Sequence, residues 1–358
     1  MQSKIQNLKG LEFSELFFEE IVRPILAEYF PKLSYTAALI GSGSEILGFD
    51  TEMSQDHDWG PRLQIFLTEI EKNLLTQPIF ERLSQKLPKE FRGFPTFFSS
   101  TKGDASPHHH IEITTIPEFI QDYLNFDIEN NLTSADWLSF PEQKLRTIIE
   151  GRVYQDEIDL QSVRERFSYY PKDVWLYLLA SAWNRIGQEE HLMGRAGIVG
   201  DEIGSAIIGA RLVRDIMKLC FLMEQKYAPY PKWFGTAFAR LSCAEKLSPI
   251  LQNTLHSHTW QEREAHLCMA YEHIAERHNA LKITPTVKTQ VHSFHERPFK
   301  VIHLENDFCG AILAEITDSE VLKISQNRII GGIDQWSDST DILSESAWRS
   351  KLWQFYTE

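Results

Sequence analysis

The sequence has few cysteines, and those it has are far apart. Cys220, Cys243, Cys268 and Cys309 show no short spacing between any two of them. This excludes a zinc ribbon, whose paired cysteines lie a few residues apart, and it excludes a dense disulfide framework. The same cysteine usage is typical of a protein from a reducing cytoplasm.

Long hydrophobic stretches are also missing. No run of about 18 apolar residues occurs, so the sequence predicts no membrane-spanning helix. Near the N-terminus, Glu12, Glu15, Glu19 and Glu20 interrupt the apolar residues, and we therefore expect no signal peptide. These absences together predict a cytoplasmic protein without a membrane partner.

Positive charge is scarce. The chain has 36 Lys and Arg against 50 Asp and Glu, which gives a formal net charge of −14. Such a charge repels nucleic-acid phosphates on average, so a nucleic-acid partner would need a local basic patch and is not expected. Apolar residues make up 42% and charged residues 24% of the chain, which are ordinary values for a globular protein and exclude overall disorder.

The hydrophobic pattern divides the 358 residues into three regions. Residues 1–127 alternate between helical and strand-like patterns and are expected to form a small mixed-sheet domain. Residues 128–284 are helical in pattern and predict a helical bundle domain. Residues 285–358 form a short mixed C-terminal segment expected to pack on the others. The predicted fold class is therefore α+β.

Local sequence patterns predict the positions of individual helices and strands. Helices are expected over 11–29, 69–86, 200–226, 258–281 and 344–356, and strands over 35–40, 57–67, 94–99, 109–115 and 299–303. Thr68 with Glu71, and Thr259 with Glu262, form capping-box patterns at the starts of two of these helices. Three glycines are expected to end helices: Gly151, Gly187 and Gly197.

The most informative segment follows the first expected strand. Gly41-Ser-Gly-Ser44 forms a loop that we expect to lead into a short helix, and Asp56 and Asp58 begin the next strand. Because side chains alternate along a strand, both carboxylates lie on one face and His57 on the other. Paired carboxylates suit Mg²⁺, and the backbone N–H groups of a glycine-rich loop at a helix N-terminus bind phosphate oxygens. The segment therefore predicts a metal and triphosphate site.

This segment resembles a known family signature. The spacing from Gly43-Ser44 to Asp56-His-Asp58 resembles that of the DNA polymerase beta-like nucleotidyltransferase superfamily. The longer string that ends Asp-His-Asp-Trp-Gly-Pro-Arg62 resembles a bacterial group known only as domain of unknown function 4037. That second resemblance extends to residues 211–215, 227–238 and 334–335. The resemblance to nucleotidyltransferases implies a nucleotidyltransferase-type sheet domain and a helical domain that closes the nucleotide and acceptor cleft.

The superfamily normally has a third acid on a neighbouring strand. Glu112, in the alternating pattern of 109–115, is the candidate, and a Glu in place of the more usual Asp leaves open whether it is a metal ligand or a general base. The alternative for Glu112 is an outward-facing strand acid without a catalytic role. Asp104 is a less favoured candidate, because its Gly, Ser and Pro neighbours place it in a turn. For Glu45 we favour an acid at a helix N-terminus over a metal ligand.

The resemblance implies nucleotidyl transfer dependent on Mg²⁺ or Mn²⁺, from an NTP, with ATP expected, to a hydroxyl of a small molecule or protein. Asp56, Asp58 and Glu112 would hold the two metal ions, and Gly43 and Ser44 would contact the distal phosphates. The acceptor hydroxyl would then attack the α-phosphate in line.

One region carries a local excess of positive charge. Residues 205–246 contain seven basic and three acidic residues, a balance of +4. Arg211, Arg214 and Lys218 are spaced to lie within about 60° of one another around a helix, and Lys232 follows in an aromatic turn. We expect these four side chains to contact the NTP phosphates across the cleft, the alternative being a solvated helix face.

Other functions remain possible from the sequence. The dense histidines at 108–110 do not predict a transition-metal site, because three consecutive strand residues cannot share one face. A modifier of tRNA ends or another polynucleotide is a second enzymatic hypothesis, which the net negative charge disfavours. A nucleotide-binding pseudoenzyme or an antitoxin-like regulatory protein is a third. The presence of both Asp56 and Asp58 favours an active enzyme over that third hypothesis.

Overall fold

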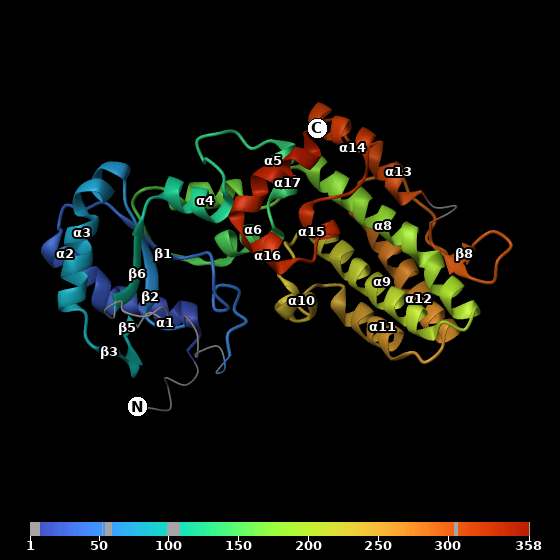
Figure 1. Cartoon of the computed structure of the whole chain (residues 1–358), viewed down its shortest axis with the longest axis horizontal. Coiled ribbons are helices and arrows are strands. Elements are labelled where there is room, and N and C mark those ends of the chain that lie inside the picture. The colour runs from blue at the N-terminus through green and yellow to red at the C-terminus, as the bar shows by residue number, and fades with distance from the viewer. Residues whose placement is uncertain (1–7, 52, 54–58, 99–107, 304–306, 358) are drawn as a thin grey trace. The chain divides into compact units, whose positions relative to one another are not determined.

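The structure of the protein is a computed structural model that describes residues 8–51, 53, 59–98, 108–303 and 307–357. The chain divides into two compact units. The first unit comprises residues 1–131 and 144–168, and the second comprises residues 132–143 and 169–358. Figure 1 shows the helices and strands of both units along the chain.

The first unit contains a small sheet with helices beside it. Its helices are α1 (Gly10–Phe17), the π-helical turn η2 (Phe18–Val22), α2 (Arg23–Tyr29), α3 (Glu69–Lys86), α4 (Ile116–Leu124) and α7 (Leu160–Arg166). The chain passes from the second unit back to the first between residues 143 and 144, within α6 (Glu142–Glu150). Its strands are β1 (Thr36–Leu39), β2 (Arg62–Phe66), β3 (Glu90–Phe91), β4 (Phe94–Pro95), β5 (Phe97–Phe98), β6 (His108–Thr114) and β7 (Arg152–Asp156).

The main sheet has the strand order β5-β6-β2-β1-β7. β2 runs parallel to β6, whereas β1 is antiparallel to both β2 and β7. One face of the sheet is apolar and packs on the N-terminal helices and α3, through the buried side chains Phe13, Phe17, Val22, Ala37, Leu63, Ile65, Ile79, Leu83 and Ile111. On the other face, Phe66 meets Phe119 of α4 at a ring distance of 5.6 Å. The described residues thus form a mixed sheet with helices on both faces.

The second unit is mostly helical. Its elements are α5 (Ser134–Ser139), α8 (Lys172–Ile198), α9 (Glu202–Met223), α10 (Pro231–Phe238), α11 (Ala244–His256), α12 (Trp260–Leu281), β8 (His292–Ser293), β9 (Lys300–Val301), α13 (Phe308–Leu313), α14 (Ser319–Asn327), α15 (Ile333–Trp336), α16 (Thr340–Ser344), η4 (Ser346–Trp348), α17 (Arg349–Trp353) and η5 (Gln354–Tyr356). The long helices α8, α9 and α12 pack side by side (Figure 1). The chain is therefore an α+β protein, as the sequence predicts.

Two glycines expected to end helices lie inside one long helix instead. Gly187 and Gly197 both fall within α8. A Cβ at Gly187 would lie 2.9 Å from Cγ of His303, and a Cβ at Gly197 would overlap Trp260. The prediction of helix ends was wrong because these glycines permit close packing of α8 on its neighbours.

The structure differs from the expected elements in two further places. β7 lies within 128–284, where the sequence indicated helices, and it pairs with β1 in the sheet of the first unit. The single closing helix expected over 344–356 is divided into η4, α17 and η5. The first difference arises from the pairing of β7 with β1, a tertiary contact that outweighs local propensity.

No helix among the described residues is long and apolar enough to cross a membrane.

His278 on α12 is a fully buried titratable group in the core of the second unit. Its ring lies 5.9 Å from the ring of Trp183 and 5.1 Å from the ring of Phe308. Burial disfavours the imidazolium, so it lowers the pKa of His278 from 6.5 to about 4. On α15, burial instead disfavours the carboxylate of Asp334 and raises its pKa from 3.8 to about 6.

We expect His278 to make the free energy of unfolding depend on pH. The unfolded chain takes up a proton below about pH 6.5 and the folded chain only near pH 4, so this residue removes up to about 3 kcal/mol of stability as pH falls between those values. Asp334 adds stability as pH falls from about 6 to 4, because in that range its carboxyl group binds a proton in the folded chain but not in the unfolded chain. The test is therefore a comparison of variants by urea unfolding from pH 7 to 4.

His278→Gln is expected to lose less stability on acidification than the wild type, and Asp334→Asn is expected to lose more. His256→Gln, at an exposed histidine of α11, serves as the control and should follow the wild type. Equal pH slopes for wild type and His278→Gln would contradict the assignment.

Candidate functional site

Several elements highlighted by the sequence meet at one edge of the sheet. β1 is antiparallel to β2 and ends at Leu39, while β2 begins at Arg62 and runs parallel to β6. The C-terminal end of β1 and the N-terminal ends of β2 and β6 therefore lie at the same edge. The Gly41–Ser44 loop leaves β1 there, and the chain returns to that edge at β2.

Polar side chains share one face of β2 and β6 at this edge. In the parallel register, Arg62 lies opposite His110 and Gln64 lies opposite Glu112. Because side chains alternate along a strand, these four positions lie on the same face. The Gln64 amide also donates to the carbonyl oxygen of Ile40 at 3.0 Å and accepts from its N–H at 3.1 Å. Gln64 thereby fixes the end of β1 where the glycine loop begins.

Arg62 holds the glycine loop in place. Its Nε donates to the Glu45 carboxylate at 2.8 Å, and its Nη2 contacts the same carboxylate and donates to the carbonyl oxygen of Ser42. Gly43 packs directly on this ion pair with a φ of +142°, and a Cβ there would overlap both Arg62 and Glu45. A side chain at position 43 would therefore strain the backbone and displace the ion pair.

The loop does not continue into the short helix expected from the sequence. Residues 44–48 form turns, in which Gly48 N–H donates to the carbonyl oxygen of Glu45 and Phe49 N–H donates to that of Ser44, both at 3.0 Å. Glu45 is consequently the buried partner of Arg62 and not an acid at a helix N-terminus. The prediction for Glu45 was wrong because the sequence does not reveal its pairing with β2.

The residues on either side of the segment 51–58 are joined by a hydrogen bond. The buried Asp50 carboxylate accepts from Trp59 Nε1 at 3.3 Å and from the Gly10 N–H at 2.8 Å, and Lys9 Nζ donates to the Asp50 carbonyl oxygen. Asp56 and Asp58 lie in this segment and outside the described residues, as does Asp104. Their proposed roles stay predictions from the sequence.

Glu112 lies in a groove along β2 and β6. The groove has a volume of about 560 Å³ and is lined by Leu39, Arg62, Leu63, Gln64, Thr76, Gln77, Phe80 and residues 108–113. The Glu112 side chain is open to solvent, yet the groove walls partly desolvate its carboxylate and raise its pKa above the usual value. Asp122 and Glu118 raise this pKa further, whereas a hydrogen bond from Gln64 and the charge of Arg62 lower it. An accessible carboxylate of raised pKa can bind a cation or accept a proton.

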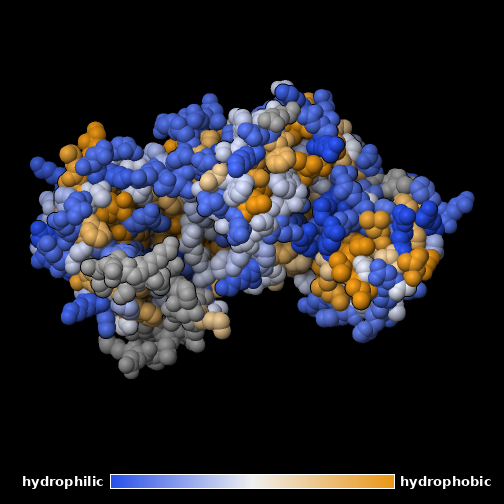
Figure 2. All heavy atoms as spheres, in the orientation of Figure 1, coloured by the Kyte–Doolittle hydropathy of each residue, from blue (hydrophilic) through white to orange (hydrophobic). Residues whose placement is uncertain are grey.

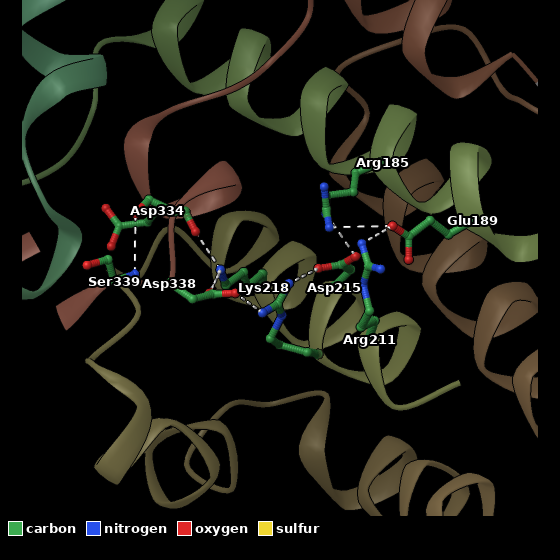
Figure 3. A network of polar contacts seen from close by, with 10 residues as sticks. Arg185, Glu189, Arg211, Asp215, Lys218, Asp334, Asp338 and Ser339 are labelled. Atoms are coloured by element: carbon green, nitrogen blue, oxygen red, sulfur yellow. Dashed lines mark hydrogen bonds and ion pairs between the residues drawn. The ribbon is translucent and has the colours of Figure 1, made fainter. Parts of the chain in front are cut away.

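The predicted phosphate-binding bases lie in the second unit, where three of them have acidic partners. Figure 3 shows that on α9 Arg211 contacts Glu189 and that Lys218 donates to the carbonyl oxygen of Asp334. The remaining contacts of this network are Arg214 with Asp215 and Asp338, Lys218 with Asp338, and Arg185 with Asp215 and Glu189.

Lys232 on α10 is exposed, with Nζ 5.5 Å from the ring centre of Trp233. The prediction that these bases face the NTP therefore requires phosphate to compete with three internal ion pairs.

Sequence reasoning missed the roles of Arg62 and Gln64. Arg62 ends the string that carries the family resemblance and Gln64 lies two residues beyond it, but only the strand register shows that both share a face with Glu112. Their alternation in β2, at positions 62 and 64, is the signal that could have indicated a polar face. Asp334, which the sequence indicates only through the family resemblance, has a buried carboxylate that accepts a hydrogen bond from the Glu142 N–H at 2.9 Å.

Carboxylate oxygens are the ligands that Mg²⁺ prefers, and the accessible Glu112 fits that preference. No cluster of three or more His, Cys, Asp or Glu within the described parts of the chain is arranged to hold a metal ion. The three-carboxylate set includes Asp56 and Asp58, which those parts do not contain, so it stays a prediction.

Comparison with known proteins supports part of the resemblance. The fold and its polar sheet edge define an α+β protein with a candidate ligand site in its sheet unit. Residues 137–234 match the sequence model of a family described as a domain of unknown function, DUF4037. No curated protein and no solved structure matches the chain. The matched residues include 211–215 and most of 227–238, two of the stretches that carry the resemblance.

Proposed function

We propose that the protein is a Mg²⁺-dependent nucleotidyltransferase that moves NMP from an NTP, with ATP as the expected donor, to a hydroxyl of a small molecule or protein. The observation that carries the proposal is the convergence at one sheet edge of the Gly41–Ser44 loop, Arg62 and Glu112. In the sequence, the segment with Asp56 and Asp58 lies between this loop and β2.

The roles follow from chemistry and position. Gly43 and Ser44 bind phosphate oxygens through backbone N–H groups and the Ser44 hydroxyl, and Arg62 positions the loop through Glu45. Asp56 and Asp58 supply hard oxygen ligands for Mg²⁺, and Glu112 is either a third ligand or the general base. When bound, Mg²⁺ neutralises charge on the α-phosphate and on the leaving pyrophosphate.

Transfer of NMP proceeds as an in-line displacement at the α-phosphorus. The acceptor oxygen forms a bond to the α-phosphorus while the bond from that phosphorus to the β-phosphate oxygen breaks, and pyrophosphate leaves. The acceptor proton passes to the Glu112 carboxylate, whose raised pKa makes it a better proton acceptor than an ordinary glutamate. If Glu112 is instead a metal ligand, solvent takes this proton.

Retention of labelled NTP on the purified protein tests the proposal first. Each of the four NTPs is offered with Mg²⁺ to the wild type and to the Asp56→Ala/Asp58→Ala variant. We expect retention by the wild type and its loss in the variant. If no NTP is retained by the wild type, both the enzyme and the nucleotide-sensing alternative are wrong.

Gly43→Ala is expected to weaken NTP binding about tenfold or more, because a Cβ strains the left-handed backbone and displaces the Arg62–Glu45 pair. Gly48→Ala is the matched control. Gly48 also has a positive φ, of +64°, but a Cβ there meets open space. Dissociation constants measured by calorimetry should change in the first variant only. Equal weakening in both would show that backbone strain alone, and not the ion pair, governs binding.

A further inference from the structure

Lys144 on α6 is a buried lysine that the proposed mechanism leaves without a role. Hydrophilic residues cover much of the surface of the protein (Figure 2), whereas Lys144 is only 7% exposed. Its Nζ donates to the carbonyl oxygen of Tyr123 at 2.7 Å and lies 5.1 Å from the centre of the Tyr123 ring. A buried ammonium group is costly unless negative charge lies near it, and lysine is therefore rarely buried.

The helix that carries Lys144 packs on the start of the Gly41–Ser44 loop. Near the end of α6, the carbonyl oxygen of Thr147 accepts the Gly41 N–H at 3.1 Å. Directly after α6, a Cβ on Gly151 would overlap the carbonyl oxygen of Leu39, so this part of the chain also lies against the end of β1. These residues all belong to the first unit, and α6 therefore supports the loop from within that unit.

Tyr123 on α4 contacts both Lys144 and the loop. Its hydroxyl lies 2.7 Å from the Thr147 hydroxyl and hydrogen-bonds with the Ser42 side chain. Its ring atom Cε2 lies 3.8 Å from the position that a Cβ would take on Gly41. Because the Lys144 ammonium group lies over the same ring, it is held beside the start of the loop that is proposed to bind phosphate.

We propose that Lys144 binds a phosphate of the NTP at the Gly41–Ser44 loop, an inference that rests on the proposed nucleotidyltransferase function. A lysine ammonium group attracts phosphate as a point charge and can donate three hydrogen bonds. A phosphate at the loop would bring negative charge beside Lys144 and offset the cost of its burial. The bases predicted from the sequence lie in the second unit, where Arg211, Arg214 and Lys218 contact acids. Lys144 instead lies in the same unit as the loop.

Calorimetric titration with ATP and Mg²⁺ compares the wild type with Lys144→Met and Lys144→Gln, which remove the charge and keep an unbranched side chain. If the wild type retains another of the four NTPs better, that NTP replaces ATP. We expect the dissociation constant to rise about tenfold or more in both variants and to be largely restored in Lys144→Arg. The constant should also rise less steeply with salt in the neutral variants, because one charged contact is lost. A change in packing alone would not alter this salt dependence.

Lys86→Met is the matched control, because Lys86 on α3 also lies over a tyrosine ring, with Nζ 5.2 Å from the ring centre of Tyr29. It should bind ATP as the wild type does. Wild-type affinity in Lys144→Met and Lys144→Gln would overturn the role of Lys144 and leave the nucleotidyltransferase assignment standing. Equal weakening in Lys144→Arg and Lys144→Met would also overturn it, because the charge would then not matter. A wild type that retains none of the four NTPs would instead contradict the proposed function itself.

Discussion

Replacing Asp56 or Asp58 by Asn is expected to lower the rate of NMP transfer about 1,000-fold or more. Each substitution removes one negative charge from the proposed Mg²⁺ ligands while keeping the size of the side chain. Loss of metal-assisted charge stabilisation is worth several kcal/mol, and about 4 kcal/mol corresponds to a factor of about 1,000 in rate. The rate of pyrophosphate release with saturating NTP and Mg²⁺ measures this effect.

Asp341→Asn is the control for charge alone. Asp341 is an exposed acid on α16 of the second unit, and its substitution changes the net charge of the chain by the same amount. We expect its rate to equal that of the wild type. Rates near wild type for both Asp56→Asn and Asp58→Asn would show that these carboxylates do not hold a catalytic metal.

Glu112→Gln is expected to lower the transfer rate about 100-fold, and Glu112→Asp less. Gln cannot accept a proton, and general-base catalysis contributes roughly 100- to 10,000-fold. Asp keeps a carboxylate on the same strand but shortens its reach. Glu90→Gln, at an exposed position of β3, is the control and should leave the rate unchanged.

The pH dependence of the transfer rate distinguishes a general base at Glu112 from an outward-facing acid without a catalytic role. A base acts in its deprotonated form, so the wild-type rate should fall as pH drops through the pKa of Glu112. Because the groove raises that pKa, the fall should begin above the usual range of a glutamate. This fall in rate at low pH should be absent in Glu112→Gln. If the rate falls in the same way in both proteins and their rates are equal, Glu112 has no catalytic role.

Elements with strong local signals could be predicted from the sequence. The expected helix over 69–86 is α3, and the Thr68 hydroxyl accepts from Glu71 N–H as the capping pattern predicts. The same pattern at Thr259 and Glu262 starts α12. In these cases the interacting residues lie three positions apart, so a short stretch of sequence contains both partners.

Pairings between distant segments could not be predicted. β7 joins β1 through partners such as Thr36 and Asp156, and no local pattern links those positions. Contacts within the site could not be predicted for the same reason. Arg62 was recognised only as part of a motif, and its contact with Glu45 depends on how β1 and β2 pair. The sequence indicated the Gly41–Ser44 loop and Glu112 as candidates at this edge, but not the contacts that Arg62 and Gln64 make there.

The most direct test of the central claim compares NTP labelled at the α-phosphate with NTP labelled at the γ-phosphate. Each is incubated with the protein, Mg²⁺ and a small-molecule extract of cells, and label is followed into small molecules and into protein. Nucleotidyl transfer predicts that α-label enters an acceptor while γ-label leaves as pyrophosphate, and that Asp56→Asn abolishes both. Transfer of the γ-label to an acceptor, or retention of NTP by the wild type with no transfer of the α-label to any acceptor, would contradict the account.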